Sequence, residues 1–393
     1  MARSRTVIVA GGGIGGLTAA LALARVGFRV VIAEQAPRLE EAGAGIQLSP
    51  NATRILNALG IGEGLAAAIV APTALRVKTH RGREIVRMPL GSTALARYGA
   101  PYWVAHRGDL QATLAAAVGH NTDITLRLGA QVEDFACHAK GITVQLRTAT
   151  GAEDEHGIAL IGADGLWSTL RARLGDQRPP HFAERTAWRA ILPAKPLVGE
   201  FREPLVSLWL GPNAHLVLYP VNGGAAINLV AIVRDHWNQP GWSAPGRREE
   251  LLEHYSGWPP LICNLLALPD RWFKWALFDR PRLRRWGEGP VTLLGDAAHP
   301  MLPFLAQGAA MAIEDAYVLA DELRRNPDKP ELGLRRYEQR RRRRAARVHR
   351  AARWNGRLYH LTGLAAVCRN RMLRARGGER LLRRYDWLYG WHP

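Results

Sequence analysis

Three glycines near the N-terminus, Gly11, Gly13 and Gly16, have a spacing that suits the binding of a dinucleotide. They follow a short apolar run at residues 6–10 and precede an alanine- and leucine-rich stretch that suits a helix. In such a unit the glycines permit a tight turn, close approach of the backbone to a pyrophosphate, and close packing of helix on strand. Glu34 lies 23 residues beyond Gly11, where an acidic side chain can accept hydrogen bonds from a ribose. The set predicts dinucleotide binding, with a glycine-rich turn that holds no ligand as the alternative.

Two further motifs pair glycine with aspartate at the end of an apolar strand. Asp164-Gly165 follows the apolar residues 158–163, and Gly295-Asp296 follows residues 291–294. Either aspartate alone could be a helix cap, because its carboxylate accepts hydrogen bonds from the free N–H groups of a helix start. Three such motifs in this order are more specific for nucleotide binding than any one of them.

A histidine and a tyrosine four residues apart, His215 and Tyr219, could place two polar rings on one surface. Residues i and i+4 of a strand face the same side, about 13 Å apart when the strand is fully extended. A bend before Pro220 would bring both rings toward one cavity. Most single histidines are surface or core residues, so the spacing alone leaves the role of His215 open.

The elements that position these residues follow from the hydrophobic pattern. Residues 6–10 and 28–33 suit buried parallel strands with a helix between them. Residues 73–90 alternate apolar with polar, as half-buried antiparallel strands do. Residues 107–118 suit a helix, residues 124–148 a strand pair with a turn near residues 140–141, and residues 186–233 one antiparallel sheet. A long helix is expected from about residue 308, and the chain after residue 330 is Arg-rich and helical.

The composition is that of a globular protein and excludes several classes. Hydrophobic residues make up 47% of the 393 residues and charged residues 22%, which argues against general disorder. The three cysteines, Cys137, Cys263 and Cys368, are too far apart for a disulfide scaffold or a Cys-based metal site. No apolar run approaches the roughly 18–20 residues of a membrane span, and the glycine motif begins too early to leave room for a signal peptide. We therefore expect a soluble, cytoplasmic protein without a bound metal.

The net charge of +19 is concentrated near the C-terminus, where nine of the 16 residues from Arg335 to Arg350 are arginine. Such an excess on a helix is usually a solvated face, although it could also attract nucleotide cofactors, aromatic acids or anionic lipid. A basic nucleic-acid- or lipid-associated protein with an incidental flavin fold is the alternative of another class. The three nucleotide motifs disfavour it, and no nucleic-acid partner is expected.

In these motifs the chain resembles the single-component FAD-dependent aromatic hydroxylases, the salicylate and 3-hydroxybenzoate hydroxylase family. The resemblance covers nearly the whole chain and implies one FAD per chain, with a transient site for NADH or NADPH. It implies that Asp164 and Gly165 contact FAD and the nicotinamide cofactor, and that Asp296 binds the FAD ribityl chain. It also implies a contact from Arg107, which begins a helix, and from the loop Gly43 to Gln47. The implied FAD-binding residues are Gly11, Gly13, Ile14, Gly15, Gly16, Glu34, Gly45, Arg107, Asp164, Gly165, Asp296, Pro303, Gly308 and Ala309.

The resemblance also assigns a reaction. Hydroxylases of 3-hydroxybenzoate and 6-hydroxynicotinate have a similar His-x-x-x-Tyr, which implies that His215 is the catalytic base and that Tyr219 contacts the substrate. The implied role of Gln307 is a hydrogen bond to the substrate hydroxyl; the alternative is a loop residue bonded to backbone. The expected activity is hydroxylation of a phenolic aromatic acid by NAD(P)H and O2 through a flavin C4a-hydroperoxide. The alternatives are a decarboxylating hydroxylase of salicylate or of 6-hydroxynicotinate, and a tailoring hydroxylase of a larger aromatic. Gln47 disfavours the 6-hydroxynicotinate substrate, because nicotinate-type enzymes tend to have histidine at this place.

The implied fold class is α/β, with a Rossmann-type FAD-binding domain interleaved with an antiparallel substrate sheet and followed by a C-terminal helical region. We expect the FAD-binding domain at residues 1–185, interrupted by a substrate-domain excursion near 73–104. The substrate sheet then takes residues 186–285, the chain returns to the FAD domain over 286–330, and residues 331–393 form the Arg-rich helical region. A homodimer is compatible with this organisation.

Overall fold

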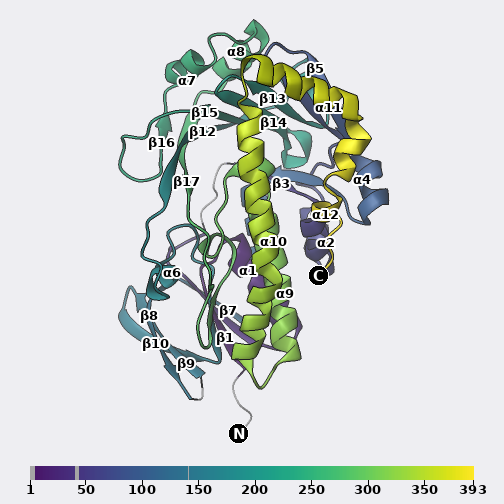
Figure 1. Cartoon of the computed structure of the whole chain (residues 1–393). Coiled ribbons are helices and arrows are strands. Elements are labelled where there is room, and N and C mark those ends of the chain that lie inside the picture. Colours follow the sequence, from purple (N-terminus) through teal and green to yellow (C-terminus); the bar gives the residue numbers. More distant parts are fainter. Residues whose placement is uncertain (1–4, 40–43, 140) are drawn as a thin grey trace.

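Two sheets, one at each end of the molecule, lie beside a long helix that reaches from one to the other (Figure 1). The structure is a computed structural model and describes residues 5–39, 44–139 and 141–393. Gly43, which belongs to one of the predicted flavin loops, lies outside the described residues.

The lower sheet is parallel and has the strand order β18-β11-β1-β2-β7. Its central strands are short apolar runs buried on both faces, as a sheet covered by helices requires. The strands are β1 (Thr6–Ala10), β2 (Arg29–Glu34), β7 (Ile124–Leu128), β11 (Ala159–Gly162) and β18 (Val291–Leu293). Helix α1 (Ile14–Arg25) packs against α5 (Arg107–Gly119) and α9 (Gly308–Arg325). All three motif loops therefore leave the carboxyl ends of neighbouring strands β1, β11 and β18, the edge at which open α/β sheets bind ligands.

The strand pair predicted over residues 124–148 is confirmed for residues 131–148, where His138 pairs with Gly141 at the turn, but residues 124–128 belong to another sheet. β7 joins the parallel sheet beside β2, and β8 (Gln131–His138) and β9 (Gly141–Thr148) pair in a separate antiparallel sheet with β10 (Gly151–Gly157). β10 has the sequence Gly-Ala-Glu-Asp-Glu-His-Gly and has no fully buried residue, so it lacks the apolar alternation by which strands are recognised.

The upper sheet has eight strands in the order β16-β17-β12-β15-β14-β13-β4-β5. It is not wholly antiparallel as predicted, because β13 runs parallel to β4. β4 comes from a distant part of the chain, so no hairpin forces it to be antiparallel to its neighbour. The strands are β4 (Ala74–Thr79), β5 (Glu84–Pro89), β12 (His181–Pro193), β13 (Leu205–Gly211), β14 (Ala214–Val221), β15 (Ala226–Arg234), β16 (Ser243–Gly246) and β17 (Trp272–Asp279).

Alternation along the upper sheet separates a core face from a cavity face. Trp188, Ala190 and Leu192 of β12 pack in a hydrophobic cluster with α7 (Arg248–His254) and α8 (Pro260–Ala267). Arg189, between them in sequence, lines a cavity on the opposite face. Because successive strand residues point to opposite faces, the same strands build a core and a site.

Smaller elements connect the two sheets and cover the space between them. The two-stranded sheet of β3 (Gly45–Leu48) and β6 (Trp103–His106) lies between the two large sheets. The remaining short helices are α2 (Pro50–Ala58), α3 (Ile61–Leu65), α4 (Gly91–Tyr98) and α6 (Thr169–Arg173).

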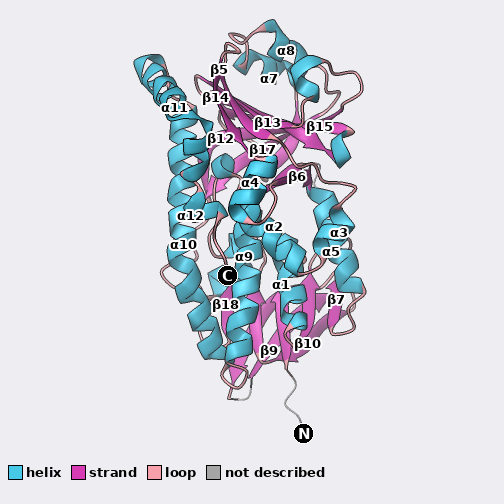
Figure 2. Cartoon of the chain, turned by 90° about the vertical axis from the view of Figure 1, so that its right-hand side faces the viewer, coloured by secondary structure: helices cyan, strands magenta, loops and turns pink. Residues whose placement is uncertain are grey.

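Three C-terminal helices complete the fold: α10 (Pro330–Tyr359), α11 (Gly363–Arg383) and α12 (Asp386–Tyr389). Helix α10 extends along one side of the molecule, and α11 then crosses β5 (Figure 2). The α11–β5 contact is close, since a Cβ on Gly378 would lie 1.8 Å from the carbonyl oxygen of Arg87. None of the helices in the described ranges has an apolar stretch of the length that a bilayer crossing requires. The domain boundaries given above stay predictions.

Candidate active site

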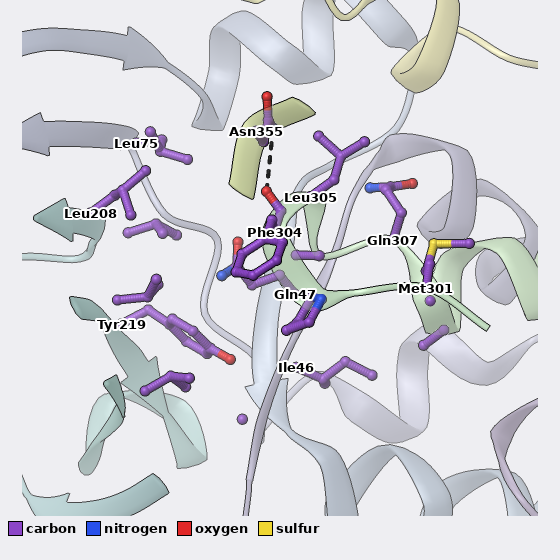
Figure 3. Close-up of a pocket in the computed structure, with 18 of the residues that line it drawn as sticks. Ile46, Gln47, Leu75, Leu208, Tyr219, Met301, Phe304, Leu305, Gln307 and Asn355 are labelled. Carbon is purple, nitrogen blue, oxygen red and sulfur yellow. Dashed lines mark hydrogen bonds between the residues drawn. The ribbon is translucent and has the colours of Figure 1, made fainter. Parts of the chain in front are cut away.

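A cavity of about 470 Å³ lies between the parallel sheet, the upper sheet and the C-terminal helices. Leu75 and Leu208 line one side, Met301 and Gln307 the other, and Tyr219 points toward the space between them (Figure 3). The C-terminal helices contribute Asn355, Leu358, Tyr359, Arg369, Met372, Leu373, Leu381, Arg384, Tyr385 and Tyr389. The cavity is therefore continuous from the glycine motif to the strand that carries His215.

The glycine motif has the geometry that its spacing predicts. Gly11 has a φ of +109°, and a Cβ there would lie 2.5 Å from the carbonyl oxygen of Ala163. A Cβ on Gly16 would lie 1.9 Å from the carbonyl oxygen of Gly11, so only glycine permits this contact between helix and turn. At Gly13, which precedes α1, an added Cβ would meet nothing within 4 Å. The open side and the uncapped N–H groups of α1 form an anion-binding position.

Glu34 holds the glycine turn by its carboxylate. Oε2 accepts a hydrogen bond of 2.6 Å from the Gly12 N–H, and Oε1 accepts one of 2.9 Å from the Ala36 N–H. Each carboxylate oxygen can accept a second bond, so these contacts leave capacity for ribose hydroxyls. Its predicted contact with a ribose stays a prediction.

The two motif aspartates differ in their surroundings. Asp164 Oδ2 accepts hydrogen bonds from the Leu170 N–H at 3.2 Å and the Thr169 hydroxyl at 3.3 Å, as a helix cap does. Its other oxygen, Oδ1, is buried and has no partner among the described residues. Asp296 is exposed to the cavity, and burial within the protein raises the pKa of its carboxyl. Both aspartates thus have an oxygen free for a ligand.

The other predicted cofactor residues line the same cavity, except for Gly11, Gly16, Glu34 and Asp164, which are not among its lining residues. Those on the wall are Gly13, Ile14, Gly15, Gly45, Arg107, Gly165, Asp296, Pro303, Gly308 and Ala309. Gly45 donates its N–H to Asn228 Oδ1 at 2.8 Å, and a Cβ there would lie 2.7 Å from the Tyr219 hydroxyl. Glycine at residue 45 therefore lets this loop reach the upper sheet.

These residues fit FAD. An anion-binding turn, an unpartnered aspartate oxygen at residue 164 and a cavity-facing carboxylate at residue 296 provide donors for the pyrophosphate and acceptors for hydroxyls. The 303–309 segment passes Asp296 and leads into α9, where a Cβ on Gly308 would lie 3.9 Å from Asp296 Oδ1.

His215 and Tyr219 lie on one face of β14 and both line the cavity, with Val217 between them. His215 is 1% exposed, and its ring packs against Phe304 and Tyr359 with centroid distances of 5.7 and 5.3 Å. Burial lowers the pKa of His215 well below its usual range and raises the pKa of Tyr219. At neutral pH the histidine is therefore an uncharged imidazole and the tyrosine an uncharged phenol.

Gln307 is 2% exposed, and its amide bonds to side chains rather than to backbone. Nε2 donates to Ser49 Oγ at 2.8 Å, and Oε1 accepts from Asn51 Nδ2 at 3.1 Å. Nε2 has a second N–H and Oε1 a second lone pair, so these contacts leave capacity for the predicted hydrogen bond to the substrate hydroxyl, which stays a prediction.

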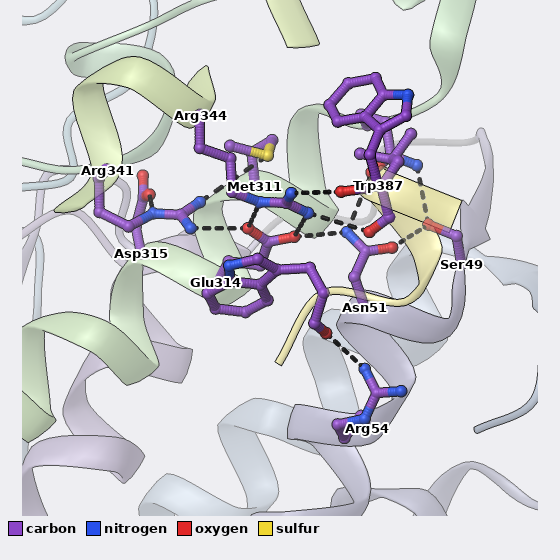
Figure 4. Close-up of polar contacts among 12 residues, drawn as sticks. Ser49, Asn51, Arg54, Met311, Glu314, Asp315, Arg341, Arg344 and Trp387 are labelled. Atoms are coloured by element: carbon purple, nitrogen blue, oxygen red, sulfur yellow. Dashed lines mark hydrogen bonds and ion pairs between the residues drawn. The ribbon is translucent and has the colours of Figure 1, made fainter. Parts of the chain in front are cut away.

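The Ser49–Asn51 pair leads into a buried ion network that includes part of the Arg-rich segment (Figure 4). Arg341, 1% exposed, approaches Glu314 at 2.7 Å and Asp315 at 2.6 Å, and Arg344 approaches Glu314 at 2.6 Å. The expectation of a solvated arginine face is therefore wrong for this part of α10. The sequence pattern of nine arginines among 16 residues does not show which of them form ion pairs with the carboxylates of α9.

Sequence reasoning missed two cationic or titratable groups beside the site. Arg189 stacks over Trp275 at 4.1 Å, lines the cavity, and has a buried Nε without a hydrogen-bond partner among the described residues. His360, directly after α10, contacts His215. Strand alternation would have placed Arg189 on the face opposite Trp188, but no sequence signal marks His360.

The fold and this site define a flavoprotein with one nucleotide-binding sheet and a substrate cavity against a second sheet. The chain belongs to the FAD binding domain family, whose model matches residues 4–352. It is 37% identical over 386 residues to 3-hydroxybenzoate 6-hydroxylase 1 of Aquipseudomonas alcaligenes, covering 98% of this chain and 97% of the relative. It is 39% identical over 392 residues to 3-amino-4-hydroxybenzoate 2-monooxygenase PtnB3 of Streptomyces platensis, covering 98% and 95%.

Solved structures with a similar fold support the same family. A salicylate hydroxylase substrate complex superposes with a TM-score of 0.82 at 26% identity, covering 100% of this chain and 97% of that one. Klebsiella pneumoniae HpxO in complex with FAD and uric acid gives 0.83 at 26% identity, covering 96% and 95%. The predicted fold class is confirmed, and the protein is an FAD-dependent aromatic monooxygenase that uses NAD(P)H. The nucleic-acid- and lipid-associated alternatives are not favoured.

Proposed function

We propose that this protein hydroxylates a phenolic aromatic acid of the 3-hydroxybenzoate or salicylate type, with NAD(P)H and O2 as co-substrates. The observation that carries the proposal is the neutral, buried His215 facing the cavity from the same strand face as Tyr219. The names of two relatives, a 3-hydroxybenzoate and a 3-amino-4-hydroxybenzoate hydroxylase, support a hydroxybenzoate ring. A cytoplasmic location and a homodimer stay predictions from the sequence.

Different residues of the cavity bind the substrate, accept its proton and exclude water. Bound FAD supplies the redox and oxygen chemistry. His215 accepts the phenolic proton, which makes the ring electron-rich, and Tyr219 hydrogen-bonds the substrate through its hydroxyl. Leu75, Leu208 and Phe304 line the space around the ring and exclude water.

Arg189 binds the substrate carboxylate in this proposal. Burial lowers the pKa of its guanidinium to about 10, so it remains cationic at neutral pH. Its buried Nε has no protein acceptor among the described residues, and a buried cation without a partner is costly. An aromatic acid supplies the missing acceptor.

The test of the function is the rate of NAD(P)H oxidation with a panel of ring compounds. Oxidation should be slow alone and should accelerate with 3-hydroxybenzoate, salicylate or 3-amino-4-hydroxybenzoate, with a product heavier by one oxygen. Mass analysis with 6-hydroxynicotinate and with larger hydroxylated aromatics tests the two alternative substrate classes, including decarboxylation. Oxidation at one constant rate with every compound, and no oxygenated product, would overturn the proposal.

Replacement of Arg189 with glutamine should raise KM for the acid substrate by about 10- to 150-fold, since a hydrogen bond to a charged group is worth about 1.5–3 kcal/mol. Arg202→Gln, at an exposed arginine outside the cavity, is the control and should leave KM unchanged. The diagnostic comparison is steady-state KM for the acid and for the matching phenol without a carboxylate. Equal increases for both compounds would show that Arg189 does not recognise the carboxylate.

A further inference from the structure

The ring of His215 is bonded on one side to a second histidine, His360. His215 Nδ1 and His360 Nε2 lie 2.7 Å apart, and the ring centroids are 5.0 Å apart. His360 directly follows α10 and is half-buried, whereas His215 is fully buried. Arg369 of α11 donates to the carbonyls of Leu358 at 2.7 Å and Tyr359 at 3.1 Å, which fixes the end of α10 beside His360. The pair therefore leads from the cavity toward the surface.

The hydrogen bonds assign the protons of the pair. Arg185 Nε donates to His360 Nδ1 over 3.3 Å, so this nitrogen is an acceptor and the proton of a neutral His360 is on Nε2. That proton is donated to His215 Nδ1, so a neutral His215 has its own proton on Nε2. His215 Nε2 has no hydrogen-bond partner among the residues that the structure describes, and the His215 ring lines the cavity.

We propose that His215 and His360 form a relay that moves the phenolic proton of the substrate from the cavity to solvent, an inference that rests on the proposed function. Transfer begins from the other tautomer of the pair, in which each ring has its proton on Nδ1, His215 Nε2 is free to accept, and the Arg185 hydrogen bond to His360 is absent. The substrate O–H bond breaks as an N–H bond forms at His215 Nε2, and the His215 Nδ1 proton passes to His360 Nε2. His360 releases its Nδ1 proton to water. A phenolate, two neutral imidazoles and one solvent proton result, so atoms and charge balance.

The arrangement of protons in the structure is the one that follows this transfer. The vacated Nδ1 of His360 accepts the hydrogen bond of Arg185, which stabilises the state in which the substrate is a phenolate. A single histidine acting alone would leave an imidazolium in an apolar cavity, and a buried charge of this kind is costly. The relay avoids that cost because neither ring holds an extra proton at the end.

The charges around the pair favour release of the proton to solvent. Burial lowers the pKa of His360 to about 4, and the cations Arg185 and Arg369 act in the same direction. Burial, then His360 and Arg185, lower the pKa of His215. The other titratable neighbours are Tyr359, whose ring packs against His215, and Tyr255, which donates to the His215 carbonyl at 2.9 Å.

Proton release on substrate binding tests the relay without turnover. Oxidised, FAD-loaded enzyme is mixed with a phenolic acid in a weakly buffered indicator dye, and phenolate absorbance is followed in parallel. The parent should release about one proton per bound phenol, in step with the phenolate band. His360→Gln can keep a hydrogen bond to His215 but cannot pass a proton, so release should slow by about 10²- to 10⁴-fold while FAD content is kept. His120→Gln, at the exposed histidine that caps the C-terminus of α5, should match the parent.

Two further variants decide the matter if His360→Gln does not fold. In His360→Ala, added imidazole should restore the fast release. In Arg185→Gln, both histidines remain and the apparent pKa of the bound phenol should rise. Parental release in a folded His360→Gln variant, or an unchanged pKa in Arg185→Gln, would overturn the relay. Failure of the proposed function is a separate result, because it appears as absent stimulation of NAD(P)H oxidation in the parent.

Discussion

Alanine in place of Asp296 is expected to weaken FAD binding by about 10- to 150-fold while leaving the protein folded. The Asp296 carboxylate is exposed to the cavity and has no hydrogen bond to the described residues, so its removal breaks no hydrogen bond among them. A ligand group bonded to it would lose a charge-assisted hydrogen bond, which is typically worth about 1.5–3 kcal/mol. The measurement is a fluorescence titration of the apoprotein with FAD, together with the flavin absorbance retained after dialysis.

The control for this experiment is Asp328→Ala, which removes an exposed aspartate far from the motif in sequence and outside the cavity lining. It should retain FAD as the parent does. Asp321, although also on a helix surface, is a poorer control because it forms ion pairs with Arg324, Arg325 and Arg340. If Asp296→Ala binds FAD as tightly as Asp328→Ala, the ribityl role implied for Asp296 is wrong.

The nucleotide-binding part could be predicted because its physics is local in sequence. Residue 16 must be glycine because a Cβ there would collide with the carbonyl oxygen of Gly11, only five residues earlier. The spacing of the glycines in the sequence shows this constraint. Glu34 follows at the end of the next strand and bonds the turn itself. By contrast, β10 could not be predicted, because its polar, partly exposed residues have no hydrophobic period. Its presence is evident only from its backbone pairing with β9.

The candidate site was only partly predictable because several of its contacts join distant segments. The spacing of His215 and Tyr219 correctly indicates a shared strand face, which is a property of any strand. His360 is 145 residues from its partner His215, and Gln307 is 256 residues from Asn51. Such pairs depend on how α10 and α9 pack on the sheets, which no local pattern in one sequence specifies.

Replacement of His215 with alanine should separate reduction of the enzyme from hydroxylation of the substrate. His215 lines the cavity from β14, whereas the glycine motif and Asp296 belong to the other sheet, so FAD content and substrate-stimulated NAD(P)H oxidation should be largely retained. Without an acceptor for its proton the phenol remains protonated and its ring is a poorer nucleophile. Hydroxylation should fall by about 10²- to 10⁴-fold, and hydrogen peroxide should account for most of the NAD(P)H consumed.

The measurement is the ratio of hydroxylated product and of hydrogen peroxide to NAD(P)H consumed, over a range from about pH 6 to pH 8. Because its pKa is lowered, His215 is neutral throughout this range, so the parent should stay coupled and should lose coupling only at lower pH, as the imidazole becomes protonated. His254→Ala, at an exposed histidine on α7, is the matched control and should behave as the parent. A packing role for His215 predicts instead a loss of folded protein or of FAD, because its ring lies against Phe304 and Tyr359. A folded, FAD-loaded His215→Ala variant that remains as coupled as His254→Ala would exclude His215 as the base and leave Tyr219 as the next residue to test.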